Sequence, residues 1–169
     1  YENEAANALY RDYVRAVVPR AIPVTAIAYA EDPTIMAWQL ANEPRPGADA
    51  RPGQHALPAF QRWIEASAAF IKSLDPAHLV STGSEGLMGC LGQAQCYRAA
   101  HESSHIDYLT LHIWPKNWGW IASDDLPGGS LAGSIEQGMS RAAHYLEQHL
   151  EQAEALDKPL VLEEFGFPR

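Results

Sequence analysis

Four short apolar runs, each followed at once by polar residues, limit the possible folds of this chain more than any other feature. The runs lie at residues 34–41, 78–83, 108–114 and 159–162. Each is apolar nearly throughout instead of alternating with polar residues, which is typical of parallel strands buried on both faces. The sequence therefore predicts a parallel sheet at the centre of the fold.

Three further segments carry apolar residues at helical spacing. The first ends at Pro19, and the second begins at Pro58 and ends before Pro76. The third begins with a capping box formed by Ser134 and Gln137. Their alternation with strands favours repeated βα units. The apolar positions expected on shared helix faces are Leu9, Tyr13 and Val17 beside Tyr10, Val14 and Val18; then Phe60, Trp63, Ile64, Ser67, Ile71 and Leu74; then Ile135, Met139, Ala142, Leu146, Leu150 and Ala153.

All four predicted strands end in polar residues. In a barrel of βα units, the side chains at the carboxyl ends of the strands build the active site. The residues at these ends are Asn42 and Glu43, then Glu85, then His112 with Trp114, then Glu163 and Glu164. The pattern predicts that they lie around one cavity.

Four strands are too few to close such a barrel, which needs eight strands and typically about 250 residues. The chain has 169 residues. We expect residues 1–169 to form a single, incomplete α/β domain. It would be a partial (β/α)8 TIM barrel holding about strands four to seven with their helices.

The charge balance restricts the partners of this chain. Its net charge is −9, with seven His counted as neutral, and such a charge repels nucleic acid and anionic lipid. No run of eighteen apolar residues is present, so no membrane span is predicted. The first residues are polar and do not resemble a signal peptide. Neutral substrates fit better, and the oligomeric state is left open.

The two cysteines, Cys90 and Cys96, lie in a segment of small and flexible residues. This favours a local disulfide, which needs Cα atoms about 5.5 Å apart. The alternative is a pair of unbonded thiols, and the spacing matches no zinc-ligand pattern. A disulfide would predict a secreted or periplasmic protein.

Two carboxyl groups about 5 to 5.5 Å apart can hydrolyse a glycosidic bond with retention of configuration. Glu43 and one residue of the pair Glu163 and Glu164 could supply them from separate strand ends. Adjacent residues on a regular strand point to opposite faces, so only one of that pair is expected to face a substrate. Each glutamate taken alone could equally be a solvated loop carboxylate.

The motifs at the strand ends together resemble the β-mannanases of glycoside hydrolase family 5. The resemblance spans nearly the whole chain and rests on YRDYVRAVV, AYAEDPTIMAWQLANEPRPG, STGSEGLMGC, DYLTLHIWPKNWGWI and KPLVLEEFGFPR. It implies retaining hydrolysis of β-1,4-mannosidic bonds in mannan-type polysaccharides, without metal or organic cofactor. It also implies that Glu43 is the general acid/base and that Glu164 is the nucleophile.

The same resemblance implies roles for neighbouring residues. Asn42 would bind the sugar 2-hydroxyl, and His112 would contact the substrate or the catalytic pair; a satisfied core histidine is its alternative. Trp114 stands where most family members carry a Tyr that supports the nucleophile, and an indole can donate a hydrogen bond but cannot accept one. This departure leaves the detail of nucleophile support open.

Charged and aromatic residues are expected at the rim of the same cavity. By the same resemblance, Arg45 and Glu85 match positions that bind sugars on the leaving-group side. For both, a loop salt bridge or a solvated charge is the alternative. Trp118 and Trp120 lie in a loop where an indole could stack on a sugar ring, although packing beneath the loop explains Trp120 equally well.

Three other functions remain open. Residues 101–105 formally match the HExxH zinc-protease pattern, but Ser103 and Ser104 do not favour the helix that this pattern needs. A β-1,4-glucanase of the same family would share the catalytic frame. An inactive carbohydrate-binding barrel fragment is the third alternative.

Overall fold

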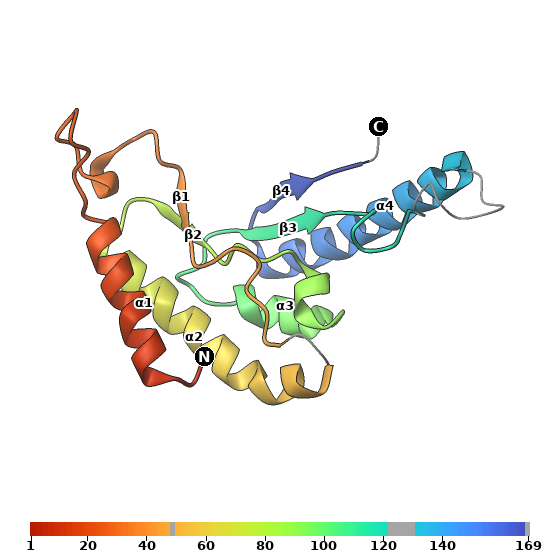
Figure 1. Cartoon of the computed structure of the whole chain (residues 1–169), viewed down its shortest axis with the longest axis horizontal. Coiled ribbons are helices and arrows are strands. Elements are labelled where there is room, and N and C mark those ends of the chain that lie inside the picture. Colours follow the sequence, from red (N-terminus) through yellow and green to blue (C-terminus); the bar gives the residue numbers. More distant parts are fainter. Residues whose placement is uncertain (48–49, 122–130, 168–169) are drawn as a thin grey trace.

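The computed structural model describes residues 1–47, 50–121 and 131–167. Helices and strands alternate along most of this length (Figure 1). The elements are α1 (Glu4–Val17), the 3-10 helix η1 (Tyr29–Glu31), β1 (Ala37–Gln39), α2 (Ala50–Leu74), β2 (Leu79–Ser81), the 3-10 helix η2 (Leu87–Cys90), α3 (Ala94–His101), β3 (Leu109–Ile113), α4 (Leu131–Leu156) and β4 (Leu160–Phe165).

The four strands follow one another in chain order and run parallel. β1 pairs with β2, and β3 pairs with β4. Between the two pairs, the amide of Asp107 donates to the carbonyl of Val80 over 2.8 Å, and the Ser81 hydroxyl donates to the carbonyl of Tyr108 over 2.7 Å. The predicted parallel βα arrangement is therefore confirmed, with one backbone and one side-chain hydrogen bond linking β2 to the start of β3.

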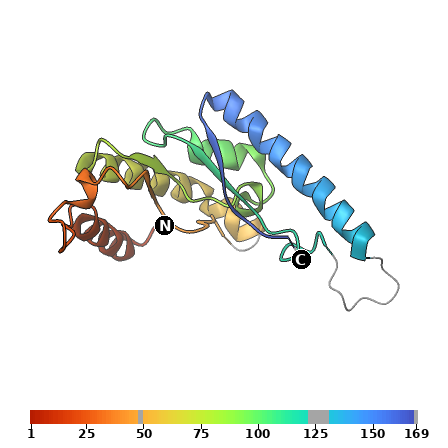
Figure 2. The same ribbon diagram turned by 90° about the horizontal axis from the view of Figure 1, so that it is seen from above.

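The helices cover one side of the strands. In Figure 1, α2 and α3 lie beneath the strands, and in Figure 2, α4 runs alongside β3 and β4. All five residues of β3 are buried, whereas Phe165 of β4 is 65% exposed and Leu79 of β2 is 41% exposed. The core is therefore deepest around β3. Both outer strands of the row, β1 and β4, are only partly covered, as expected of strands at a sheet edge.

Helix α2 buries the face that its sequence predicts, but it begins earlier. Phe60, Ile64 and Ile71 are at most 3% exposed. The start predicted at Pro58 is wrong, because the helix already includes residue 50 and Pro58 lies inside it. A proline there removes one helical hydrogen bond. Leu57 and Phe60 pack against the core on either side of it, and their burial offsets that loss.

Two other helix predictions are also corrected. Ser134 is not the N-cap of α4, because the helix already includes Leu131. Helix α3 was not predicted at all, since its eight residues begin in the segment read as a flexible cysteine loop. In α1, Val14 is buried, whereas Leu9 and Tyr13 are 71% and 67% exposed, so only one of the two neighbouring apolar rows faces the core.

Cys90 and Cys96 are joined by a disulfide with a Cα–Cα distance of 5.6 Å. The bond connects the end of η2 to the first turn of α3. It therefore ties the segment that follows β2 to the helix that precedes β3.

Two histidines of the outer helices are completely buried. His101 contacts the Thr82 hydroxyl through Nε2 and the Tyr97 carbonyl through Nδ1. Burial lowers the pKa of His101 to about 4 and that of His149 to about 4. Helix α3 ends at His101, and His105 instead contacts Glu65. The two histidines of the HExxH match therefore do not share a helical face.

The low pKa of His149 predicts a specific acid sensitivity. An unfolded histidine binds a proton below about pH 6.5, whereas folded His149 does so only below about pH 4. Between these values the unfolded state binds more protons, so His149 lowers the free energy of unfolding by up to about 3 kcal/mol as the pH falls. His149→Gln should remove this contribution, as measured by denaturant unfolding from pH 7 to pH 4. An unchanged pH slope in the variant would contradict the assignment.

Candidate active site

Glu43 occupies a strained turn directly after β1. Its backbone adopts the left-handed conformation with φ of 47°, which costs a non-glycine residue about 1 kcal/mol or more. The Glu43 amide donates to the carbonyl of Gly83 over 2.9 Å, so the turn is anchored to the segment after β2. This anchoring holds the Glu43 carboxyl at the carboxyl ends of the strands.

His112 of β3 brings two glutamates together. Its ring is 2% exposed, and its Nδ1 lies 2.8 Å from Glu43 Oε1 and 3.3 Å from Glu164 Oε2. These three atoms are all within 4.8 Å of one another. Carboxyl groups of two different strand ends are thus close to the separation of about 5 to 5.5 Å that retaining glycosidases use.

Trp114 supports Glu164 from the end of β3. Its indole Nε1 donates to Glu164 Oε2 over 3.1 Å, so this oxygen is close to both the indole and the His112 ring. Among the described residues, no side chain or backbone group donates a hydrogen bond to the other carboxylate oxygen, Oε1. Trp114 therefore supplies a donor to one oxygen of the Glu164 carboxylate, and Glu164 lines the cavity described below.

Arg45 links Glu43 to Glu85, the acidic residue after β2. Arg45 Nη2 lies 3.5 Å from Glu43 Oε2, and its Nε forms an ion pair with Glu85 Oε1. The Glu85 side chain is 1% exposed, and this oxygen receives no aligned hydrogen bond. Burial raises the pKa of Glu85 above its ordinary value, while the Arg45 charge works in the opposite direction.

Helix α4 holds the segment that carries Glu85. The Tyr145 hydroxyl donates to the Glu85 carbonyl over 2.8 Å and accepts from the Met88 amide over 3.1 Å. The Leu87 amide donates to His149 Nε2 over 2.9 Å. Sequence reasoning missed Tyr145 and His149, because four-residue spacing on a helix of apolar residues indicates ordinary core positions.

A cavity of about 500 Å³ opens beside these groups. Its lining comes from all four strand ends and is mainly polar or aromatic: Asn42, Glu43, Arg45, Glu85, Trp114, Asn117, Trp118 and Glu164. Among the described residues, every predicted site residue except buried His112 and the two cysteines lines it. Trp120 does not; its ring packs against Trp118 and Tyr145 with centroid distances of 4.8 and 5.5 Å.

The adjacent acidic pair does not follow the parity of a regular strand. In the pairing of β3 with β4, Leu111 faces Leu162, but His112 faces Glu164, so Glu163 is an extra residue in a bulge. The regular alternation assumed for this pair is therefore interrupted. Glu163 Oε2 lies 3.8 Å from His112 Nε2, although only Glu164 lines the cavity.

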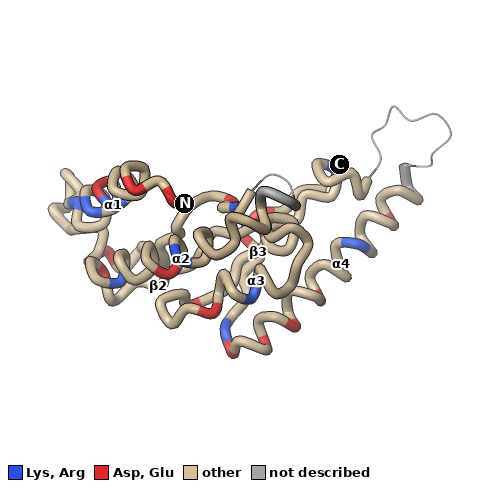
Figure 3. The backbone as a smooth tube through the Cα atoms, turned by 90° about the horizontal axis from the view of Figure 1, so that it is seen from below, with Lys and Arg blue, Asp and Glu red and all other residues tan. Residues whose placement is uncertain are grey.

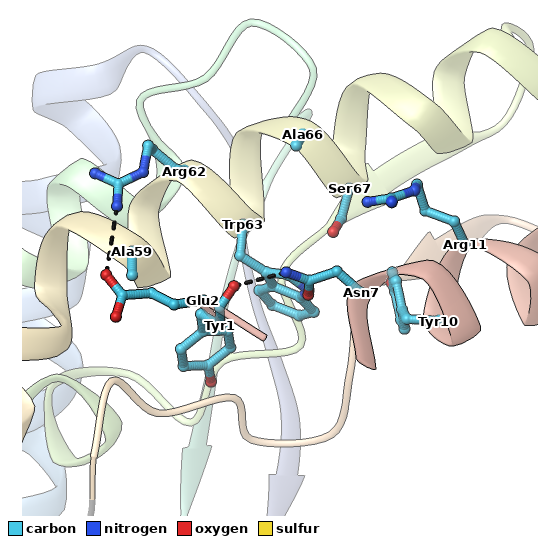
Figure 4. A pocket seen from close by; sticks show the side chains of 10 residues that line it. All are labelled: Tyr1, Glu2, Asn7, Tyr10, Arg11, Ala59, Arg62, Trp63, Ala66 and Ser67. Carbon is cyan, nitrogen blue, oxygen red and sulfur yellow. Dashed lines mark hydrogen bonds and ion pairs between the residues drawn. The ribbon is translucent and has the colours of Figure 1, made fainter. Parts of the chain in front are cut away.

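A second hollow of about 360 Å³ lies between α1 and α2 (Figure 4). Tyr1 and Trp63 form part of its wall, with ring centroids 5.1 Å apart. Glu2 is the single carboxylate in its lining and pairs with Arg62. The cavity at the strand ends instead brings together three glutamates, Glu43, Glu85 and Glu164, from three different strand ends, and it is therefore the candidate active site.

The cluster of Glu43, His112 and Glu164 is also the one group of described residues spaced to share a cation. The distance of 2.8 Å from His112 Nδ1 to Glu43 Oε1 is that of a hydrogen bond, and Glu164 Oε2 lies within ion-pair distance of the same nitrogen, at 3.3 Å. Elsewhere, Lys and Arg alternate with Asp and Glu along the described chain and form no continuous basic stripe (Figure 3). None of the described helices is long and apolar enough to cross a bilayer.

Comparison with known proteins shows a match over the complete chain. A family described as glycoside hydrolase family 5 β-mannosidase-like matches residues 1–169. Mannan endo-1,4-β-mannosidase 4 of Solanum lycopersicum is 28% identical over 98% of this chain, and mannan endo-1,4-β-mannosidase 7 of Arabidopsis thaliana is 35% identical over 93%. The chain spans 40% and 36% of these two relatives.

Solved structures of similar proteins agree with the fold. A glycoside hydrolase family 5 mannosidase from Rhizomucor miehei has a TM-score of 0.79 with 34% identity, and 99% of this chain covers 36% of it. An endo-1,4-β-D-mannanase from Thermotoga petrophila has a TM-score of 0.78 with 30% identity, and 99% of this chain covers 46% of it. The chain is a partial TIM barrel, as predicted.

The contacts around Glu85 predict that any side chain at position 86 would destabilise the fold. The φ of Gly86 is 98°, and an added Cβ would come within 2.3 Å of His149 Nε2 and 2.5 Å of the Tyr145 hydroxyl oxygen. Gly86→Ala should lower the free energy of unfolding by about 2 to 4 kcal/mol, combining backbone strain with overpacking.

Gly119→Ala is the matched control for this substitution. Its φ is also positive, at 69°, but an added Cβ there meets nothing within 4 Å. Only backbone strain of about 1 kcal/mol is expected. Equal losses for the two variants in denaturant unfolding would show that the contacts with His149 and Tyr145 are unimportant.

Proposed function

Because the chain belongs to the glycoside hydrolase family 5 β-mannosidase-like family, we propose that the protein hydrolyses β-1,4-mannosidic bonds in mannan-type polysaccharides by double displacement. The observation that carries the mechanism is the approach of Glu43 and Glu164 to within 4.8 Å around His112 Nδ1. The substrate is inferred from the relatives, which are named mannan endo-1,4-β-mannosidases.

In the first step, Glu164 attacks the anomeric carbon of the bound sugar. Its Oε2 is close to the Trp114 indole and the His112 ring, so Oε1 is the attacking oxygen. The bond to the leaving group breaks, and Glu43 gives its proton to the departing oxygen. The products of this step are a glycosyl ester on Glu164 and an ionised Glu43.

In the second step, the ionised Glu43 removes a proton from water. The water oxygen attacks the anomeric carbon, the ester bond to Glu164 breaks, and the Glu164 carboxylate is restored. Glu43 ends the cycle protonated, so one residue serves as acid and then as base. No step needs a metal or organic cofactor.

The remaining cavity residues are proposed to bind sugar hydroxyls and rings. Asn42 lies beside Glu43 and is placed to contact the hydroxyl next to the reacting carbon. Arg45 and Glu85 offer a charged donor and acceptor on the leaving-group side. Trp118 lines the cavity and is half-buried, which leaves part of its ring for stacking on a sugar.

We also propose that the protein works outside the reducing cytosol. The support is the disulfide between Cys90 and Cys96, since such bonds persist mainly in oxidising compartments.

Removing either proposed catalytic carboxyl group should nearly abolish turnover. Glu43→Gln and Glu164→Gln keep the side-chain shape but cannot transfer a proton or attack as a carboxylate. In the full-length polypeptide that contains this chain, each should lower kcat on mannan about a thousandfold or more. A chelator should leave wild-type turnover unchanged.

Glu65→Gln is the control for these two variants. Glu65 is exposed and pairs with His105 away from the cavity, so normal kcat is expected. A rate near the wild-type value for Glu43→Gln or Glu164→Gln would exclude that residue from its role.

Release of reducing ends from three polymers tests the substrate. We expect the full-length protein to act on mannan and galactomannan far more than on carboxymethylcellulose. Dominant activity on the cellulose derivative would identify a β-1,4-glucanase instead. Binding of mannan without release of reducing ends would indicate an inactive carbohydrate-binding barrel.

A further inference from the structure

The turn that carries Glu43 has a tyrosine hydroxyl bound at each end. Just before the turn, the Tyr10 hydroxyl donates to the Leu40 carbonyl over 2.9 Å. Just after it, the Tyr1 hydroxyl donates to the Arg45 carbonyl over 2.7 Å. One donor lies in α1 and the other shortly precedes it, outside the cavity that contains the carboxyl groups. The mechanism proposed above gives neither tyrosine a part.

A turn of this kind needs anchors, because its backbone is strained. The φ of Glu43 is 47°, and a residue with a side chain keeps such a conformation only where the surrounding structure holds it. The Glu43 amide donates to the Gly83 carbonyl over 2.9 Å, but the contact of the Ala41 amide with the Thr82 carbonyl is longer, at 3.4 Å. The backbone link to the segment after β2 is therefore weaker just before Glu43, next to the carbonyl that Tyr10 binds.

A tryptophan of α2 packs against both tyrosine rings. The centroid of the Trp63 six-membered system lies 5.1 Å from the Tyr1 ring and 5.5 Å from the Tyr10 ring (Figure 4). Trp63 and Tyr10 pack against the hydrophobic core. The Asn7 side chain donates to the Tyr1 carbonyl over 2.6 Å, which ties Tyr1 to α1. Both hydroxyls are therefore carried by side chains whose rings are already held in place.

The Tyr10 hydroxyl is a donor throughout the neutral pH range. Burial raises the pKa of Tyr10 to about 12, while a hydrogen bond with Ser67 works in the opposite direction. Leu40 is 4% exposed, so little water reaches its carbonyl. Because buried carbonyl groups normally have a partner, loss of the Tyr10 hydroxyl would free this end of the turn.

We propose that Tyr10 and Tyr1 are positioning residues for Glu43. By holding the backbone on both sides of the turn, they keep the Glu43 carboxyl group aligned with the oxygen that it protonates. This inference rests on the proposed function and adds to it two residues from outside the cavity. Neither tyrosine touches the substrate. Tyr10 is the more buried of the two, so its loss has the larger effect.

Proton transfer by Glu43 is sensitive to alignment, because the carboxyl group must lie within hydrogen-bond reach of the leaving oxygen. A displacement of about 1 Å can lower a rate roughly a hundredfold. A looser turn should therefore slow the steps in which Glu43 transfers a proton and leave the attack by Glu164 intact. A leaving group that departs without a proton separates these two effects.

The first experiment compares two substrates in the full-length polypeptide that contains this chain. A β-1,4-mannan oligosaccharide needs a proton on its leaving oxygen, whereas dinitrophenyl β-mannobioside releases a stable anion and needs none. The constant kcat/KM is measured because it reports only the steps up to the glycosyl ester, before Glu43 acts as a base. Tyr10→Phe removes the hydroxyl and keeps the ring. Its kcat/KM should fall roughly tenfold on the oligosaccharide but by less than about twofold on the aryl substrate.

Tyr13→Phe is the matched control for these rates. It removes a tyrosine hydroxyl from the same helix, on a side chain that is 67% exposed, and should leave both constants at wild-type values. Equal falls on the two substrates in Tyr10→Phe, or no fall on either, would overturn the inference. If Tyr10→Phe does not fold, Tyr1→Phe replaces it. A fall of roughly threefold on the oligosaccharide alone is then expected, and equal or absent falls again contradict the inference.

Amide hydrogen exchange in the same protein provides a second measurement that needs no substrate. The Glu43 amide reports on the turn directly, through its hydrogen bond to the Gly83 carbonyl. In Tyr10→Phe this amide should exchange about fivefold faster, as expected for the loss of one hydrogen bond that holds the turn. Tyr97→Phe is the control, because it removes a hydroxyl that donates to the Thr110 carbonyl of β3 over 2.8 Å. Exchange at Glu43 should be unchanged there.

The exchange result separates a local effect on the turn from a general loss of stability. Equal acceleration at Glu43 in Tyr10→Phe and Tyr97→Phe would mean that the whole fold is destabilised, and would overturn the inference. Exchange at the wild-type rate in Tyr10→Phe would overturn it as well. Absence of turnover in the wild type would contradict the proposed function alone, because exchange still decides whether Tyr10 holds the turn.

Discussion

The contact of His112 Nδ1 with two carboxyl groups is the interaction on which the site depends. Glu43 arrives from a strained turn after β1, and Glu164 arrives from the end of β4. Two carboxyl groups this close would repel one another if both were ionised in a poorly hydrated site. A donor between them converts that repulsion into two favourable contacts, so a buried histidine on the central strand makes the acidic pair possible.

The rest of the structure keeps this contact in place. β3 is buried along its whole length, which fixes the backbone that carries His112. Helix α4 supports the neighbouring segment through Tyr145 and His149, and the Cys90–Cys96 bond ties that segment to α3. These contacts tie the supporting groups to one another, which is the arrangement expected for a site that must hold its groups before substrate binds.

Much of the fold could be predicted because burial leaves a clear pattern in the sequence. The apolar runs located all four strands, and the polar residues after them located the cavity. Two helix starts were misplaced, because Pro58 and Ser134 are good first-turn residues, yet α2 and α4 already begin at residues 50 and 131. Helix α3 was missed because the two cysteines dominated the interpretation of a short segment.

The parts of the site that could not be predicted depend on the register between β3 and β4, that is, on which residues of the two strands lie opposite one another. Nothing in residues 159–165 indicates a bulge, since the extra residue exists only relative to β3. The position of Glu163 beside His112 follows from that bulge, and so does the failure of simple alternation. The supports from α4 were likewise invisible, because Tyr145 and His149 contact a segment 57 to 62 residues away in sequence.

The central claim is that Glu164 attacks the anomeric carbon while Glu43, across one short gap, protonates the leaving oxygen and then activates the water that releases the sugar. The most direct measurement is the configuration of the first product, followed by proton NMR during hydrolysis of a β-1,4-mannan oligosaccharide by the full-length protein. Two displacements at one carbon predict that the β-anomer forms first and that the α-anomer grows only through mutarotation. Initial formation of the α-anomer would mean a single displacement by water and would contradict the account.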